Sequence, residues 1–411
     1  MKIAFYIHHS TISAGGIFTY SIGILRQLVN SPDIEKIIII TSKEVADTLA
    51  EFRKNKKIEI SIVDRKNILV NLMFLNWYGL YIVTLFVQKL VLAKVSFNRV
   101  KQFLAKLNPY QIIFKINEID ILHIPVQYSP IYKANTPVII TMHDLQEYHF
   151  PQYFSLKERL HRFINNRMAI YDSDHIIVSF EHIKKDIIKY FNIDSEKVSV
   201  CPPPFAEDWF LNKNESDWNQ IQKKYNLKKK YILYPAATWE HKNHLTLLDA
   251  VKKIRNEGLD YELLCTGNKT KYFSILVIKI KELQLSDSVH FLGIVPEEDL
   301  ISLYKNSALV VIPTLYEAGS GPLYEAMRYQ VPVICSKVTS LPDTVANNEF
   351  LFDPENVSEL VMKIKSGLID EDFRRRNIEN SKQRMEYFRK KNYSENFIEV
   401  YKRLYKQVDL H

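Results

Sequence analysis

The chain has 411 residues, which is too long for one hydrophobic core of ordinary size and predicts two domains. Hydrophobic residues make up 46% and charged residues 25%, values that are typical of a folded chain and exclude a disordered one. The net charge of +8 suits an anionic partner, but the basic residues are dispersed and no aromatic RNA-binding motif accompanies them. We therefore expect no nucleic acid as a partner, which leaves an anionic membrane surface or a phosphorylated substrate.

The first half of the chain alternates short apolar segments with helical ones. The apolar segments are β-branched and nearly continuous in apolar character, as in strands buried on both faces of a parallel sheet. The expected strands are 2–9, 36–42, 58–63, 120–125, 137–144, 175–180 and 197–202, and the expected helices include 17–29, 156–171 and 181–191. This alternation predicts a doubly wound α/β domain over residues 1–204. Because the chain opens directly with a buried strand, we expect no secretory signal.

The segment "ILVNLMFLNWYGLYIVTLFVQ" (68–88) interrupts this pattern. It carries no charge and is flanked by basic residues, namely Arg65, Lys66, Lys89 and Lys94. A helix that is apolar on all sides is buried in protein or in lipid, and roughly 20 apolar residues suffice to span a bilayer. Three interpretations stay open: packing in the core, a monotopic membrane contact through residues 68–94, and a true span. The basic flanks would favour anionic headgroups.

The proline run "CPPPF" (201–205) marks a linker, because consecutive prolines continue neither a helix nor a central strand. The strand–helix alternation then restarts. The expected strands of this half are 231–236, 261–267, 288–293, 308–314 and 331–336. They predict a second Rossmann-like domain over residues 205–389, followed by a charged C-terminal helix at about 390–411.

Two features bear on metals and redox state. The three cysteines are scattered without metal-ligand spacing, and we expect reduced, packed thiols, as in a cytoplasmic protein; they are Cys201, Cys265 and Cys335. The Asp-x-Asp spacing of "DSD" (172–174) could join a divalent cation to a diphosphate. It lies at the amino end of a predicted strand, whereas ligands bind at the carboxyl ends. We therefore expect no metal site.

The stretch "YEAGSGPLYEAMRYQVPVICS" (316–336) carries the most informative pattern. Glu317 and Glu325 stand on either side of a Gly-Ser-Gly turn that follows a strand and opens a helix near Pro322. Such a turn lies at the carboxyl end of a parallel strand, where its backbone N–H groups and the helix dipole favour a phosphate. Glycine also allows the backbone to approach a ligand closely.

Two carboxylates beside a phosphate-binding turn indicate a ligand that also carries hydroxyl groups. Glu325 is placed to accept hydrogen bonds from a vicinal diol such as a ribose, and Glu317 to face the other end of the ligand. Together they predict a nucleotide-diphosphate ligand with a polyhydroxyl group. The spacing leaves an alternative open, in which both glutamates only complement the positive end of the helix.

These residues form the E-x7-E motif of retaining GT-B glycosyltransferases, and the chain resembles glycosyltransferase family 4. Residues 290–343 follow the family pattern nearly end to end, and "YPAATWEHKNHLTLLDA" (234–250) resembles its phosphate-binding strand and helix. Residues 173–187 resemble the last unit of its N-terminal domain, and "AGG" (14–16) its acceptor-side glycine loop. The resemblance implies the GT-B fold: two Rossmann-like domains facing across a cleft, with the C-terminal helix packing back on the first.

The resemblance also implies roles on the donor side. Glu325 would hold the ribose hydroxyls, Glu317 would contact the transferred sugar near the reacting centre, and Lys242 would stabilise the leaving diphosphate. The other residues expected to bind the donor are Gly319, Ser320, Gly321, Pro322, Thr238 and Gly267.

One position departs from the family pattern. Many members carry an arginine six residues before the lysine, whereas this chain has Ala236, as in the branch that reads YPA-x-x-W-x-HKNH. Electrophilic help would then come from Lys242, the helix dipole, and His241 or His244. A surface or capping role for these two histidines is left open.

In the N-terminal domain, His143 ends a predicted strand and resembles the family histidine that lies near the donor sugar. The resemblance implies a catalytic role, and the alternative is that His143 orients a loop through a backbone hydrogen bond. The remaining acceptor-side residues are Gly15, Gly16 and Asp144, and the strand-ending histidines expected to line the cleft at most are His8, His9 and His123.

The implied reaction is transfer of a hexosyl group from a nucleotide-diphosphate sugar to an acceptor hydroxyl, with retention of configuration and without a metal or cofactor. The apolar segment 68–88 favours a lipid-linked or growing glycan as acceptor. That would place a cytoplasmic protein at the inner face of the cytoplasmic membrane, in the assembly of a bacterial surface polysaccharide such as lipopolysaccharide or capsule. Two alternatives are a GT-B enzyme with a soluble acceptor and a catalytically silent homologue that binds sugar nucleotides.

Overall fold

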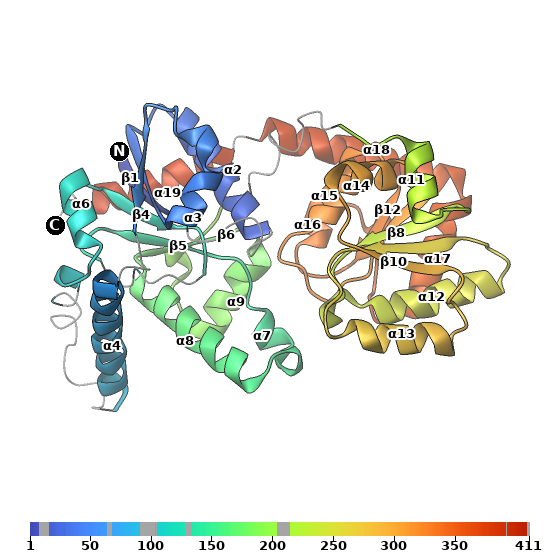
Figure 1. Ribbon diagram of the computed structural model, residues 1–411, viewed down its shortest axis with the longest axis horizontal. Coiled ribbons are helices and arrows are strands. Elements are labelled where there is room, and N and C mark those ends of the chain that lie inside the picture. The colour runs from blue at the N-terminus through green and yellow to red at the C-terminus, as the bar shows by residue number, and fades with distance from the viewer. Residues whose placement is uncertain are drawn as a thin grey trace. The chain divides into compact units, whose positions relative to one another are not determined.

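The computed structural model describes residues 1–7, 16–63, 68–90, 103, 105–127, 131, 134–203, 214–391 and 393–408. The chain forms two compact units (Figure 1). The first comprises Met1–Phe205 and Asn392–His411, and the second comprises Ala206–Lys391. The sequence placed the two boundaries after residues 204 and 389.

The described part of the first unit is built on a seven-stranded sheet with the order β3-β2-β1-β4-β5-β6-β7, in which all neighbours are parallel. The strands are β1 (Lys2–Ile7), β2 (Lys36–Thr41), β3 (Ile58–Ile62), β4 (Ile121–Ile124), β5 (Val138–Met142), β6 (His175–Val178) and β7 (Val198–Val200). Alternate side chains of β1 enter two different cores, with Phe5 on one face of the sheet and Ala4 and Tyr6 on the other. Burial on both faces explains the nearly continuous apolar runs.

Helices flank this sheet, and several begin or end with recognisable caps. They are α2 (Gly16–Asn30), α3 (Lys43–Thr48), α4 (Ile68–Leu90), α6 (Gln111–Asn117), α7 (Gln146–His149), α8 (Leu156–Asp172), α9 (Glu181–Phe191) and α19 (Tyr393–Val408), with short 3₁₀ turns at Ala50–Phe52, Pro151–Tyr153 and Ser195–Lys197. Ser155 and Glu158 form a capping box at the start of α8, and Asn192 ends α9 in the left-handed conformation.

The last helix, α19, packs on the first unit beside α2, although more than 350 residues separate them in the chain (Figure 1). Phe397 and Tyr401 enter the core, and the Tyr401 hydroxyl lies 2.6 Å from Nδ1 of His123. His123 is fully buried and also bonds Thr141 at 3.0 Å. The expectation that His123 lines a ligand cleft is therefore wrong, because this end of β4 is covered by α19.

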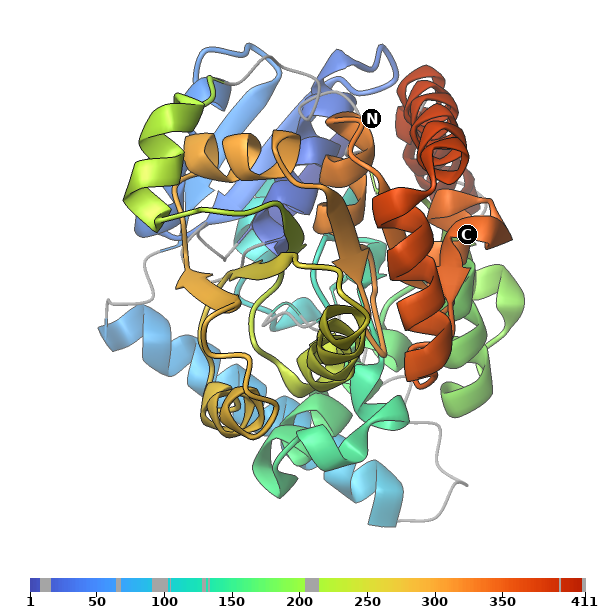
Figure 2. The ribbon, with the colours of Figure 1, turned by 90° about the vertical axis from the view of Figure 1, so that its right-hand side faces the viewer.

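The segment 68–88 folds as part of α4, which Figures 1 and 2 show at the edge of the first unit. Trp77 is buried, but Leu75, Leu80 and Phe86 are 53%, 54% and 63% exposed. Packing in the core is therefore wrong for these side chains. Within the described residues, no helix combines the length and the apolar character needed to cross a bilayer.

The second unit contains a six-stranded parallel sheet with the order β10-β9-β8-β11-β12-β13. Its strands are β8 (Tyr231–Pro235), β9 (Glu262–Thr266), β10 (Val289–Gly293), β11 (Leu309–Ile312), β12 (Val333–Ser336) and β13 (Leu351–Phe352). Its helices are α11 (Trp218–Tyr225), α12 (His244–Asn256), α13 (Phe273–Glu282), α14 (Glu297–Lys305), α15 (Gly321–Arg328), α16 (Leu341–Val345), α17 (Val357–Ile369) and α18 (Glu371–Lys390), with 3₁₀ turns at Glu240–Lys242 and Asn348–Phe350. Two doubly wound α/β units confirm the predicted fold class.

The cysteines and the Asp-x-Asp pair contribute to packing. All three cysteines are free and buried, as predicted. Asp174 accepts a hydrogen bond from the backbone N–H of Val138 at 2.7 Å, and Asp172 is buried at the junction of α8 and β6. Burial raises the pKa of Asp172 to about 7.

Candidate active site

The strand order of the second unit reverses at β8, since β9 lies on one side of it and β11 on the other. The loops after β8 and β11 therefore lead away from the sheet in different directions and leave a crevice at their carboxyl ends, where ligands bind in such folds. Lys242 follows β8, and Glu317 follows β11. The candidate site thus lies at the topological switch point of the second unit.

Lys242 and Glu317 meet at this point. The ammonium Nζ of Lys242 donates to Oε2 of Glu317 at 2.6 Å, and the two side chains are only 19% and 12% exposed. A close, largely buried pair of opposite charges is stabilised by a weakly screened Coulomb attraction. The structure therefore brings together two residues that the sequence predicted for different ends of one ligand.

The loop after β8 is held in place by several hydrogen bonds. The Tyr234 hydroxyl donates to the carbonyl of Lys242 at 2.8 Å. Asn243 adopts a left-handed conformation with φ of 58°, and its amide donates to the carbonyls of Pro313 and Pro354. Burial, and then the negative charge of Glu317, raises the pKa of Tyr234 well above its ordinary value.

The loop after β11 is tied directly to the loop after β8. The carbonyl of His241 accepts hydrogen bonds from the Leu315 N–H at 2.7 Å and from the Thr314 hydroxyl at 3.0 Å. Thr339 clamps Glu317, because its hydroxyl accepts from the Glu317 N–H at 3.0 Å and donates to the Glu317 carbonyl at 2.7 Å. The Ser340 hydroxyl donates to the same carbonyl at 3.0 Å. The backbone of Glu317 is thus held on both sides.

The Gly-Ser-Gly turn opens α15, as predicted. Ser320 is the N-cap residue, and its hydroxyl accepts from the Leu323 N–H at 3.4 Å. Pro322 occupies the first turn of the helix, whereas Gly319 and Gly321 are partly exposed on either side of the buried Ser320. The start of α15 therefore presents glycine backbone on the same loop as Glu317.

Glu325 lies one turn into α15 and is partly exposed. Its neighbour is Tyr304 of α14, which is fully buried. Burial, followed by the charge of Glu325 and a hydrogen bond to it, raises the pKa of Tyr304 well above its ordinary value. Contact with this tyrosine orients the Glu325 carboxylate.

Thr238, in the loop after β8, and Gly267, directly after β9, lie where these two loops meet. Thr238 is buried, and its hydroxyl accepts from the Thr270 N–H at 2.8 Å. A Cβ on Gly267 would lie 2.7 Å from backbone atoms of Ala236 and Ala237, and its φ is +112°. Glycine is therefore required at residue 267, where two backbone segments approach closely.

The two histidines beside Lys242 carry no positive charge near neutral pH. Burial, and then the charge of Lys242, lowers the pKa of both His241 and His244 to about 3. The ring of His244 is buried between Tyr234 and Phe291, with ring centroids 4.8 Å and 5.7 Å away. The lowered pKa values favour neutral rings, so charge at this point of the site comes from Lys242, and His241 contributes its backbone carbonyl to the loop.

The predicted acceptor-side residues belong to the first unit. His143 follows β5, and its Nε2 donates to the Pro125 carbonyl at 2.8 Å, which is the loop-orienting bond that the sequence left open. Burial lowers the pKa of His143. The side-chain oxygen of Gln127 accepts from the backbone N–H groups of His143 and Asp144, and Asp144 also pairs with Arg162 at 3.2 Å.

Of the predicted glycine loop (14–16), Gly16 is among the described residues. Gly16 begins α2, and a Cβ there would meet nothing within 4 Å, so no steric demand for glycine arises at this position. Gly15, His8 and His9 lie outside the described residues. Among the residues that are described, no group of three His, Cys, Asp or Glu side chains is placed to hold a metal ion.

Sequence reasoning missed the residues that hold the candidate site together. Thr339, Ser340, Tyr234 and Asn243 act through backbone contacts, and their residue types carry no signal of such a role. Asn243 is a partial exception, because asparagine is enriched in the left-handed conformation that it adopts after a 3₁₀ turn. A signal for Thr339 is absent from the sequence pattern.

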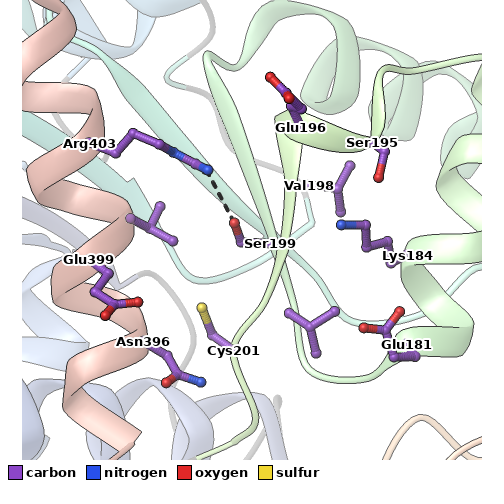
Figure 3. A pocket seen from close by; sticks show the side chains of 12 residues that line it. Glu181, Lys184, Ser195, Glu196, Val198, Ser199, Cys201, Asn396, Glu399 and Arg403 are labelled. Carbon is purple, nitrogen blue, oxygen red and sulfur yellow. Dashed lines mark hydrogen bonds between the residues drawn. The ribbon is translucent and has the colours of Figure 1, made fainter.

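A separate cavity of about 470 Å³ lies in the first unit, between β7, α9 and α19 (Figure 3). Figure 3 shows Arg403 pointing to Ser199, and the guanidinium donates to that hydroxyl at 3.2 Å. Both acidic and basic side chains line the cavity, including Glu181, Lys184 and Glu399. It contains none of the predicted site residues and offers no concentration of one charge.

Comparison with known proteins covers most of the chain. Residues 216–384 match the family model for glycosyl transferases group 1, and residues 84–208 match the model for Glycosyltransferase Family 4. An O-antigen chain mannosyltransferase of Salmonella typhimurium is 29% identical over 227 residues, 55% of this chain and 60% of that protein. Escherichia coli O-antigen chain mannosyltransferase B is 28% identical over 239 residues, 57% of this chain and 62% of that protein. The matches thus span less than two thirds of these relatives.

Solved structures extend the likeness to the full chain. A glycosyltransferase from Rickettsia africae has a TM-score of 0.68 at 18% identity and covers 98% of both chains. Anabaena HepE in complex with UDP-glucose has a TM-score of 0.65 at 15% identity and covers 100% of both chains. At these identities the likeness establishes the fold. The two family matches and this fold together show that the chain belongs to the group 1 glycosyltransferases of GT-B fold.

Proposed function

We propose that this protein is a retaining glycosyltransferase that moves a hexosyl group from a nucleotide-diphosphate sugar to an acceptor hydroxyl. The observation that carries the proposal is the Lys242–Glu317 pair, 2.6 Å apart at the switch point, with Glu325 on the helix that follows. These are the cation and the two carboxylates that such a donor requires. A catalytically silent homologue would have no need to keep all three.

The residues divide the donor among them. Glu325 accepts hydrogen bonds from the ribose hydroxyls, and the partly exposed glycine backbone at the start of α15 binds the diphosphate. Lys242 exchanges Glu317 for the diphosphate when the donor enters, and Glu317 then accepts from hydroxyls of the transferred sugar. Thr339 and Ser340 hold the Glu317 backbone while its side chain changes partner.

Leaving-group stabilisation supplies the catalytic effect. The C–O bond between the anomeric carbon and the diphosphate breaks through an oxocarbenium-like transition state, and the acceptor oxygen bonds to the same carbon. Negative charge develops on the departing phosphate oxygen, which takes up the proton of the acceptor hydroxyl. Lys242 and the N-terminus of α15 neutralise this charge in a water-poor crevice. We propose that the transfer is metal-independent, because this ammonium provides the charge that a divalent cation provides in other transferases. His143, which orients the loop after β5, is proposed to act near the donor sugar.

The proposed acceptor is a lipid-linked or growing glycan of a bacterial surface polysaccharide, at the inner face of the cytoplasmic membrane. The curated relatives named above are O-antigen chain mannosyltransferases, which supports both the pathway class and a hexose as the transferred group. The exposed apolar side chains of α4 support a lipid environment over a soluble acceptor.

The test is a screen of the purified protein against UDP-, GDP- and dTDP-sugars by thermal shift and donor hydrolysis. Lys242→Ala and Glu325→Ala are measured beside Lys281→Ala, an exposed lysine of α13 in the same unit. We expect one nucleotide family to stabilise the wild type and Lys281→Ala but not the two site variants, and the product anomer, read by NMR, to match the donor. Absence of a shift with every nucleotide would contradict the proposal and favour the silent homologue.

A further inference from the structure

The helix α4 exposes apolar side chains along most of its length. Besides Leu75, Leu80 and Phe86, the side chains of Ile68 and Val83 are 76% and 59% exposed. No acidic residue occurs between 68 and 90. Scattered single apolar residues on a surface are ordinary, but this many on one helix mark a site of interaction with another apolar surface or with a membrane.

A second apolar surface lies on the first half of α8. Leu156, Leu160 and Phe163 recur at helical spacing and are 81%, 60% and 39% exposed. They line a groove of about 490 Å³ together with Pro151 and Arg159. Figures 1 and 2 both show α4 and α8 at the same lower edge of the first unit.

Basic side chains border the apolar surface of α8. Lys157, Arg159 and Arg167 are exposed on this helix, and the Arg167 guanidinium lies 4.4 Å from the ring centroid of Phe163. The one exposed acid of α8, Glu158, is engaged in the capping box with Ser155. The combination of exposed leucines and an aromatic ring with a basic fringe is that of a helix lying in the interface of an anionic bilayer.

We propose that α4 and the first half of α8 form a membrane-docking face, which binds the surface of a bilayer that contains anionic phospholipids. Apolar side chains of both helices enter the boundary of the acyl chains, and Lys157 and Arg159 contact lipid phosphates. A second copy of this chain is a poorer occupant, because pairing two copies of this face would bring two basic fringes together, and the one exposed acid of α8, Glu158, is already engaged in the capping box. The link from this face to a lipid-linked acceptor rests on the proposed function, whereas the face itself rests on the exposure and charge described here.

The test is co-sedimentation of the full chain with vesicles of phosphatidylcholine alone and of equal parts phosphatidylcholine and phosphatidylglycerol. Leu75→Ser/Leu80→Ser/Phe86→Ser removes apolar surface from α4, and Lys157→Glu/Arg159→Glu reverses the charge on α8. The matched controls change exposed residues of the second unit in the same way: Ile278→Ser/Met362→Ser/Ile369→Ser and Lys253→Glu/Lys281→Glu.

We expect the wild type and both controls to bind the anionic vesicles, and each test variant to bind about tenfold or more weakly. Wild-type protein that binds neither kind of vesicle, or controls that weaken binding as much as the test variants, would overturn the proposal. So would a concentration-dependent dimer, found by light scattering, that the α4 variant abolishes while vesicle binding is absent. Thermal melting of each variant shows whether it is folded, and the α8 variant changes only exposed side chains.

Donor hydrolysis in the absence of vesicles separates this proposal from the proposed function. A protein that hydrolyses a sugar nucleotide but ignores vesicles overturns the docking face alone. A protein that binds anionic vesicles but no nucleotide overturns the transferase proposal and leaves the docking face standing.

Discussion

Replacing Glu317 by glutamine is expected to tighten the binding of a nucleoside diphosphate while it impairs transfer. The Lys242 ammonium donates to Oε2 of Glu317 at 2.6 Å. A diphosphate has to displace this carboxylate and then sits beside its negative charge. Glutamine keeps the size of the side chain, removes the charge and leaves the ammonium available to the phosphate.

The magnitude follows from the geometry of the pair. At an effective dielectric constant of about 20, two unit charges at this distance attract by about 6 kcal/mol before desolvation is subtracted. Exposed pairs retain up to about 1 kcal/mol, and removal of one partner from a fully buried pair costs about 3–5 kcal/mol. The side chains of Lys242 and Glu317 are 19% and 12% exposed, between these cases. We take about 1–2 kcal/mol, which lowers Kd by about 5- to 30-fold.

Isothermal titration with UDP, GDP and dTDP measures this effect for the nucleotide that the wild type binds. Glu282→Gln, an exposed change of the same charge on α13, is the control and is expected to leave Kd unchanged. In Glu317→Gln/Lys242→Met the gain should disappear, because it depends on the freed ammonium, and the double-mutant cycle reports the coupling of the two residues. An equal or higher Kd in folded Glu317→Gln would refute the reasoning.

Three further substitutions test the framework of the site and the core. In Gly267→Ala the added Cβ meets backbone at 2.7 Å, whereas Gly258 also has positive φ but open space around it. Urea denaturation should show that Gly267→Ala lowers the free energy of unfolding by about 1–3 kcal/mol more than Gly258→Ala does. Thr339→Val removes both hydrogen bonds to the Glu317 backbone and should lower kcat/KM about tenfold, together with about 1–3 kcal/mol of stability because the Glu317 N–H loses its bond to the hydroxyl. Thr48→Val, which loses one hydroxyl bond in α3, should leave kcat/KM intact. The folded pKa of Asp172 is about 7, above its ordinary 3.8, so between these values the folded state holds a proton that the unfolded state releases. Stability should therefore fall as pH rises from about 4 to about 7, and Asp172→Asn should flatten that slope.

The sequence predicted the site residues because strand, loop and helix follow one another in a recognisable order. Lys242 and Glu317 each stand in a loop after an apolar strand, and such loops lie at the carboxyl edge of the sheet. Their contact was not predictable from local pattern, since 75 residues separate them and the contact exists because β8 and β11 are neighbours. Strand order is a property of the whole sheet.

The errors have physical causes as well. His123 ends an apolar strand just as His143 does, but the hydroxyl that covers it comes from Tyr401, 278 residues later in the chain. The uncharged segment of α4 predicted a helix, but a helix that is apolar on every side carries no direction, so its sequence says nothing about which face the protein covers. For the described side chains the structure shows which side of α4 the protein covers, since Trp77 is buried and Phe86 is exposed.

The hydrogen bonds between the loops after β8 and β11 determine which interactions a donor has to break when it binds, as we propose, at Lys242. The loops after β8 and β11 are linked through the His241 carbonyl and the Asn243 amide, and both links use the backbone of the opposite loop. The Lys242–Glu317 pair is therefore not what holds the loops together. If a diphosphate takes the ammonium, as we propose, it has to break only this side-chain pair, and the flexible stem of lysine allows this without breaking the links between the loops. For this reason Glu317→Gln should alter nucleotide affinity at a loss of stability no larger than the about 1–2 kcal/mol of the pair. Asn243→Ala, which removes hydrogen bonds between the loops, should lower the melting temperature further.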